Sequence, residues 1–272
     1  MSLGKLDQIH AGYIGPKPMY EGDYLEQILD LFETSNNFVP EWWSDTDGKK
    51  YPYDRTDLLS TIRNRVHADL FPSVSFGRKK TPKNDCYVGI SLEQAISSDL
   101  GKSTARKHWQ PWMELMDKLV AIFEPSFGTV GFIPEWRNET GELSPRDITA
   151  VEFLYSSRIN GTQYWLKAGL RGVATRTYFG EHFIDLFGRE NLLSTPNTVI
   201  KELDWGGIRM DLMDDITTVN EEELFANWRA AMDHLLQFEV FAHMKLDDKQ
   251  RVQLTKGARW EPSPKMRLPE RK

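Results

Sequence analysis

This chain of 272 residues lacks several features that define common functional classes. It has one cysteine, Cys86, which excludes an internal disulfide and a cluster of thiolate metal ligands. No apolar run approaches the roughly 18 residues of a membrane span, and residues 1–15 lack the apolar core of a secretion signal. We therefore expect a soluble cytoplasmic protein without a membrane partner.

Catalytic motifs are equally scarce. The six histidines form neither an HxxxH pair nor an HExxH motif, and no GxSxG elbow occurs. Residues 100–104, LGKST, lack the first glycine of a phosphate-binding loop, because Ile96 stands in its place. We expect no catalytic residue, no cofactor and no metal. One enzymatic alternative stays open, a metal-dependent hydrolase that uses Glu181, His182 and Asp211.

Positive charge is scarce over most of the chain. Residues 245–272 contain nine Lys and Arg against four acids, which leaves 25 basic and 36 acidic residues in 1–244. Nucleic acids require clustered positive charge, so we expect no nucleic-acid partner. The acidic body suits a basic partner, with ordinary solubility as the competing interpretation. We divide the chain into a core domain, 1–244, and a basic, proline-containing C-terminal segment, 245–272.

Hydrophobic periodicity predicts helices and strands that are interspersed without regular alternation. Helices are expected near residues 24–32, 56–66, 111–123, 144–155, 179–187 and 220–243. Strands are expected near residues 11–15, 73–77, 87–92, 128–133, 163–170, 198–203 and 208–212. This pattern predicts a single α+β domain with a mostly antiparallel mixed sheet and helices packed on it. Residues 38–43, FVPEWW, echo residues 132–137, FIPEWR, through duplication or coincidence.

The most informative stretch is residues 205–212, WGGIRMDL, together with the acids that follow it. Alternation over residues 208–212 predicts a half-buried strand that leads into an anionic surface. Residues 211–223 contain six carboxylates and no basic residue: Asp211, Asp214, Asp215, Glu221, Glu222 and Glu223. The three glutamates also fit the start of a helix capped by Asn220, so part of this charge has a structural explanation.

Residues 178–188, YFGEHFIDLFG, and 203–212, LDWGGIRMDL, resemble bacterial immunity proteins encoded beside polymorphic toxins. The resemblance is closest to the partners of type VI secretion effectors, and residues 12–15 and 39–42 agree more loosely. It implies an α+β, non-enzymatic, cytoplasmic protein that binds and blocks a cognate toxin. The immunity type it resembles most accompanies nuclease toxins with a restriction-endonuclease-like domain.

The charge pattern and the resemblance predict the same kind of binding site. A nuclease attracts a polyanion with a positively charged cleft, and an acidic surface can occupy that cleft. We expect the charge to come from the six acids of residues 211–223, and an apolar anchor to come from Trp42, Trp43 or Trp205. Inhibition from a site remote from the cleft stays open, as does a structural or adaptor role without a toxin.

Overall fold

The computed structural model describes residues 8–16, 18–19, 22–45, 49–67, 73–78, 86–91, 95–100, 106–133, 153, 169–215, 218, 220–246 and 252–262. The helices are α1 (Tyr24–Glu33), α2 (Arg55–His67), α3 (Trp109–Phe123), α5 (Glu181–Phe187), α6 (Arg189–Leu193) and α7 (Glu221–Leu236). The strands are β1 (Gln8–Ile14), β2 (Trp42–Ser44), β3 (Lys50–Pro52), β4 (Ser73–Gly77), β5 (Cys86–Ser91), β6 (Ala95–Leu100), β7 (Phe127–Ile133), β8 (Arg176–Phe179), β9 (Val199–Glu202), β10 (Ile208–Asp211), β11 (His243–Leu246) and β12 (Val252–Thr255).

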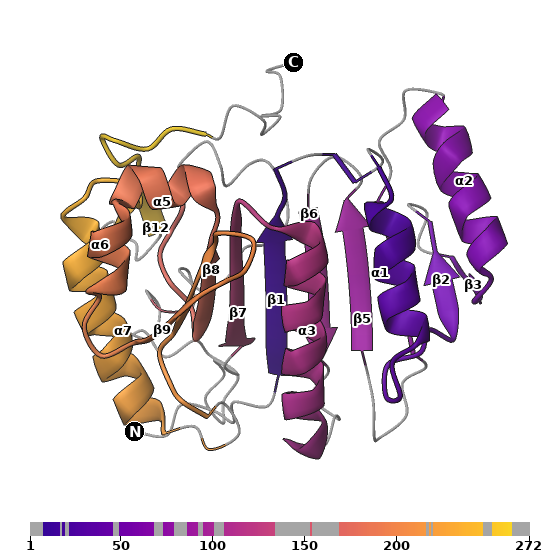
Figure 1. Cartoon of the computed structure of the whole chain (residues 1–272), viewed down its shortest axis with the longest axis horizontal. Coiled ribbons are helices and arrows are strands. Elements are labelled where there is room, and N and C mark those ends of the chain that lie inside the picture. Colours follow the sequence, from indigo (N-terminus) through magenta and orange to yellow (C-terminus); the bar gives the residue numbers. More distant parts are fainter. Residues whose placement is uncertain are drawn as a thin grey trace.

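A ten-stranded sheet in the order β3-β2-β4-β5-β6-β1-β7-β8-β10-β9 forms the centre of the molecule. All the strand pairs described within it are antiparallel, and β11 and β12 form a separate antiparallel pair. In Figure 1, α1 and α3 lie in front of the central strands and run along them, α2 stands beside β2 and β3, and α5, α6 and α7 gather at the other end. The predicted α+β class with a mostly antiparallel sheet is confirmed.

Helices cover both faces of the β7–β8–β10 part of the sheet. Neighbouring residues of a strand point to opposite faces. On β8, Tyr178 donates a hydrogen bond to Asp117 of α3, whereas the ring of the next residue, Phe179, contacts Phe187 of α5. Therefore α3 and α5 lie on opposite faces. The face of the sheet on which a side chain lies therefore decides which helix it can contact.

The face beneath α1 and α3 is an apolar core. Helix α3 places its apolar residues against the sheet and ends at Glu124, whose φ of 45° is left-handed. Trp112 at 0% exposure is the largest of its fully buried side chains. The apolar side chains of α3 are removed from water when the helix packs on the sheet. Their burial is the main contribution that stabilises this packing.

Several predicted elements are found close to their expected bounds. The strand predictions near residues 11–15, 73–77, 87–92, 128–133, 198–203 and 208–212 correspond to β1, β4, β5, β7, β9 and β10. Strands β2, β3, β6 and β8 were not predicted, because they are short or lack clear alternation. The helix predicted for 144–155 and the strand predicted for 163–170 lie outside the described residues, apart from Phe153, Gly169 and Leu170.

The last helix is shorter than the sequence predicts. Helix α7 ends at Leu236 rather than near residue 243, because Glu239 adopts a left-handed φ of 58° and β11 begins at His243. Trp260, in the basic C-terminal segment, is 2% exposed and stacks on Phe183 of α5 with ring centroids 5.7 Å apart. Among the described residues, no helix is both long and apolar enough to cross a bilayer.

Candidate functional site

The exposed part of the acidic stretch lies between the end of β10 and the first turn of α7. We call its carboxylates, those of Asp214, Asp215, Glu221, Glu222 and Glu223, the acidic surface. All are exposed except Glu221, which is half-buried. The structure thus places five of the six predicted acids where their charge can reach a partner.

The backbone under the acidic surface is anchored at both ends. The Asn220 side chain accepts hydrogen bonds from the backbone N–H groups of Glu222 at 3.1 Å and Glu223 at 3.4 Å, which confirms the predicted helix cap. One turn further along α7, the Asn227 amide donates to the Leu212 carbonyl at 2.9 Å. Because Glu223 and Asn227 share one side of the helix, this bond brings the start of α7 close to the end of β10.

Asp211, the sixth predicted acid, lies inside a charge cluster instead of facing solvent. Its Oδ1 accepts a hydrogen bond from Arg176 Nε at 2.5 Å, and its Oδ2 lies 2.9 Å from Arg209 Nε. Asp117 accepts hydrogen bonds from Nη1 of both arginines, at 3.0 and 3.1 Å, and from the Tyr178 hydroxyl at 2.5 Å. Two positive and two negative charges therefore balance within the cluster. At 5% exposure, Asp211 neutralises two half-buried arginines and does not offer its charge to a partner.

Burial governs protonation in this cluster. It raises the pKa of Asp211, while Arg176 and Arg209 oppose the rise by stabilising the carboxylate. It also raises the pKa of both Tyr178 and Tyr13, whose ring centroids are 5.9 Å apart. The cluster joins side chains from β8, β10 and α3 and has Tyr13 of β1 beside it, so it fixes the strand that leads to the acidic surface.

Trp205 and its two glycines form the turn between β9 and β10. Gly206 has a φ of 88°, a conformation that favours glycine, and its N–H donates to the Leu203 carbonyl at 2.8 Å. A side chain on Gly207 would collide with the Trp205 ring, so the indole lies across this glycine. Trp205 is half-buried and packs on the core. It is the only one of the three predicted tryptophan anchors that is not buried.

Trp42 and Trp43 occupy a different part of the molecule. Both are 6% exposed, so the structure places them inside the protein rather than at its surface. The Trp42 indole donates to the Arg78 carbonyl at 2.7 Å and lies beneath Lys50, whose Nζ is 4.0 Å from the ring centroid. Strand β2 is seven positions from β10 in the sheet order, roughly 30 Å away. These tryptophans therefore do not join the acidic surface.

The alternative hydrolase arrangement is not assembled. His182 belongs to α5, and its Nε2 lies 2.9 Å from the Glu261 carbonyl oxygen. Asp211 contacts Arg176, which is bonded to Asp117 of α3. Since α3 and α5 cover opposite faces of the sheet, His182 and Asp211 cannot act on one substrate atom in this fold.

The partners of Asp211 were not identified from the sequence. Asp117 and Arg209 are 92 residues apart in the chain, and Asp117 and Arg176 are 59 apart. No local pattern connects such positions. The alternation of Arg209 and Asp211 on one strand face was the only available indication, since it places both side chains on the same side of β10.

Comparisons with known proteins identify a shared fold. No protein-family model matches the chain, and no curated protein matches it. Four chains of solved structure match. One is the Pseudomonas aeruginosa T6SS protein PA0821, with a TM-score of 0.54 and 14% sequence identity over 92% of this chain and 79% of that chain. At this identity the likeness establishes a similar arrangement of helices and strands.

Proposed function

We propose that this protein is a bacterial immunity protein that binds and neutralises a cognate toxin of a type VI secretion system, in the cytoplasm of the cell that carries both. The observation that carries the proposal is the acidic surface. Its carboxylates are presented from an anchored backbone and lie outside the charge cluster that encloses Asp211. A preorganised anionic surface of this kind is suited to a basic protein partner.

Two likenesses support this choice of partner. Residues 178–188 and 203–212, which resemble immunity proteins, form the β8–α5 connection and the β9–β10 turn with the strand after it. The structural neighbour is named as a T6SS protein. Its name states neither an immunity role nor a nuclease partner, so the toxin, and its nuclease activity in particular, are parts of our proposal.

The two parts of the acidic surface would act differently. Glu221, Glu222 and Glu223 lie in the first turn of α7, where the positive end of the helix dipole offsets part of their charge. Asp214 and Asp215 precede the helix and are exposed, so the helix dipole does not offset their charge in the same way. A nuclease with a restriction-endonuclease-like cleft would meet these two aspartates first, and the inhibitor would then occupy the path of the nucleic acid.

Co-expression tests the proposal directly. The chain is produced in bacteria together with a toxin domain encoded in the adjacent gene, and survival and complex formation are measured. We expect the wild-type chain to restore growth and to elute with the toxin in one peak. If the toxin still kills at full inhibitor expression and no complex is recovered, the immunity function is wrong.

Charge reversal then tests the acidic surface. Asp214→Lys combined with Asp215→Lys should slow association with the toxin by roughly tenfold at low salt, with a smaller effect at high salt. Glu222→Lys and Asp57→Lys form a matched pair, since both replace an exposed acid in the first turn of a helix, α7 and α2 respectively. We expect only Glu222→Lys to slow association. Equal rates for this pair, together with an unaffected double variant, would place the interface elsewhere.

A further inference from the structure

Strand β9 leaves one edge of the ten-stranded sheet open. It is last in the strand order, and no described strand lies beyond it. Its sequence contains the β-branched residues Val199 and Ile200 and no proline. The strand at the opposite edge, β3, contains Pro52, a residue type that hinders the pairing of an edge with a further strand. Of the two edges, β9 is therefore the one better suited to accept an added strand.

The hydrogen bonds that β9 already makes show which of its backbone groups are open. The Leu203 N–H donates to the Gly207 carbonyl at 2.9 Å, so Leu203 faces β10. In an antiparallel pair, the hydrogen-bonded positions alternate along the strand. Lys201, two residues earlier, therefore also faces β10. The N–H and C=O groups of Ile200 and Glu202 point the other way, toward the open edge.

The edge is held in place by α6 and by the core. Arg189 of α6 forms an ion pair with Glu202, and its Nη2 donates a hydrogen bond to the Gly206 carbonyl at 3.0 Å. Ile200, on the same face of β9 as Glu202, packs against the core. The backbone of β9 is thus fixed before a partner arrives, which lowers the entropy cost of binding there.

The other face of β9 is open to solvent. Val199 and Lys201 share this face and are both exposed. At 44% exposure, Val199 is the most exposed large apolar side chain in the described part of the chain. It pairs with Asp211, the last residue of β10, and the chain continues from there to Asp214 and Asp215. The open edge and the acidic surface are therefore neighbours.

We propose that an extended segment of the toxin adds to this edge as a further strand. Its backbone exchanges hydrogen bonds with Ile200 and Glu202, and it places an apolar side chain beside Val199 and an acidic one beside Lys201. The proposal rests on the immunity function proposed above and adds a second contact beside the acidic surface.

A second copy of this chain fits the edge less well. Strand β9 has only four residues, whereas a stable dimer buries roughly 1,200 Å² or more in total. When Ile200 of each copy lies opposite Glu202 of the other, the two Lys201 side chains face each other, and such like charges are destabilising. The toxin also contacts the acidic surface, so a short added strand does not have to supply the whole interface.

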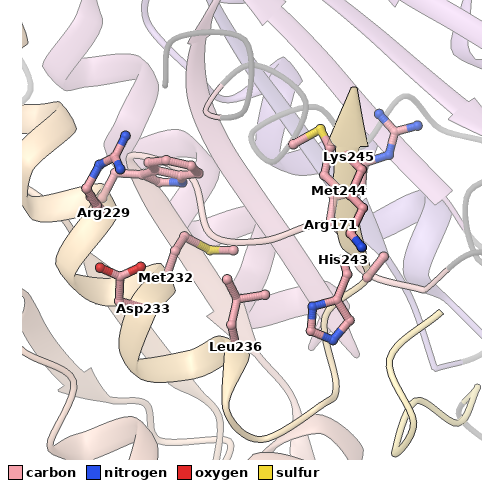
Figure 2. Close-up of a pocket in the computed structure, with 10 residues that line it drawn as sticks. Arg171, Arg229, Met232, Asp233, Leu236, His243, Met244 and Lys245 are labelled. Atoms are coloured by element: carbon pink, nitrogen blue, oxygen red, sulfur yellow. The ribbon is translucent and has the colours of Figure 1, made fainter. Parts of the chain in front are cut away.

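A pocket between α7 and β11 provides an internal reference for a test. In Figure 2, Met232 and Leu236 of α7 lie on one side of this pocket and Met244 lies on the other. Leu236 is on the side of α7 opposite to Asn227, which is bonded to the end of β10. The pocket therefore lies across α7 from the end of β10 and at the opposite end of α7 from its glutamates.

Amide hydrogen exchange tests the proposal on the wild-type chain, alone and in complex with the toxin domain of the co-expression experiment. In the isolated chain, the amides of Ile200 and Glu202 should exchange rapidly and that of Lys201 slowly. In the complex, exchange at Ile200 and Glu202 should slow by about tenfold or more. The Lys201 amide and the methyl signals of Met232 and Met244 should not change.

Two substitutions of Glu202 form a matched pair. Both remove the carboxylate, but only Glu202→Pro also removes the outward N–H and places a ring where the added strand would lie. Because this N–H points away from β10, the proline is compatible with the fold, and both variants should unfold at the same urea concentration. We expect Glu202→Pro to weaken toxin binding by about tenfold or more, and Glu202→Ala by less than about twofold.

The outcomes separate this proposal from the immunity function. If a complex forms but exchange at Ile200 and Glu202 is unchanged, or if the two Glu202 variants bind equally, the added strand is wrong and the immunity function stands. Slow exchange at these amides that depends on the concentration of the isolated chain would assign the edge to a second copy instead. Shifts at Met232 and Met244 without protection of β9 would place the toxin at the pocket. If no complex forms, both proposals fail.

Discussion

Replacing Asp211 by asparagine should lower the free energy of unfolding far more than the loss of one exposed carboxylate does. The substitution keeps the shape of the side chain but leaves Arg176 and Arg209 with Asp117 as their one remaining counter-ion in the described part of the chain. Removing one partner of a buried ion pair costs about 3–5 kcal/mol. Since Asp117 is 35% exposed and can share its site with water, we expect the lower end, about 3 kcal/mol.

Urea unfolding measures this cost. With a slope near 3 kcal/mol per molar, the midpoint should fall by roughly 1 M. The matched control, Asp214→Asn, removes an exposed carboxylate three residues away and should change stability by less than about 0.5 kcal/mol. Adding Arg209→Met to Asp211→Asn leaves one arginine opposite Asp117, so the double variant should lose less than the sum of the two single losses. If Asp211→Asn unfolds with the wild-type midpoint, the charge cluster contributes little and our account of Asp211 is wrong.

Three further outcomes follow from the structure. Gly207→Ala should cost about 2 kcal/mol by displacing the Trp205 ring, measured by urea unfolding and tryptophan fluorescence, and it should cost much less when Trp205 is also replaced by alanine. Asn220→Ala should cost about 1 kcal/mol in the same assay, whereas Asn220→Asp should be nearly neutral, and equal losses would contradict the cap. The folded-state pKa values of Tyr13 and Tyr178 lie above the ordinary 10.0, so the stability gained from their neutral forms is complete below pH 10 and is lost as the pH rises further. Tyrosinate absorbance should show these two groups ionising only on unfolding, and their titration in the folded protein would contradict this.

The acidic stretch illustrates how far local sequence can predict a site. Asn220 followed by three glutamates predicts a helix start, because a cap and a dipole involve only residues within one turn. The alternation in β10 likewise predicts a strand. Which of the six acids would be exposed depended on Asp117 and Arg176, and those contacts form only when α3 packs on the sheet.

The tryptophans show the same limit. Their apolar character predicts burial or a binding surface, and the sequence does not choose between these. The order of strands in the sheet decides between them. Strand β2 lies between β3 and β4 and far from β10, whereas Trp205 lies at the turn between β9 and β10.

The sequence by itself determined the α+β class, the acidic character of the body, the strand that follows Gly207 and the capped helix after it, because these depend on composition and on neighbours in the chain. The tertiary structure decided that Asp211 is buried while Asp214 and Asp215 are exposed, and that Trp42 and Trp43 lie in another part of the molecule. The physical reason is that burial and charge pairing depend on distances between residues far apart in the chain, which are set only when the sheet and its helices come together.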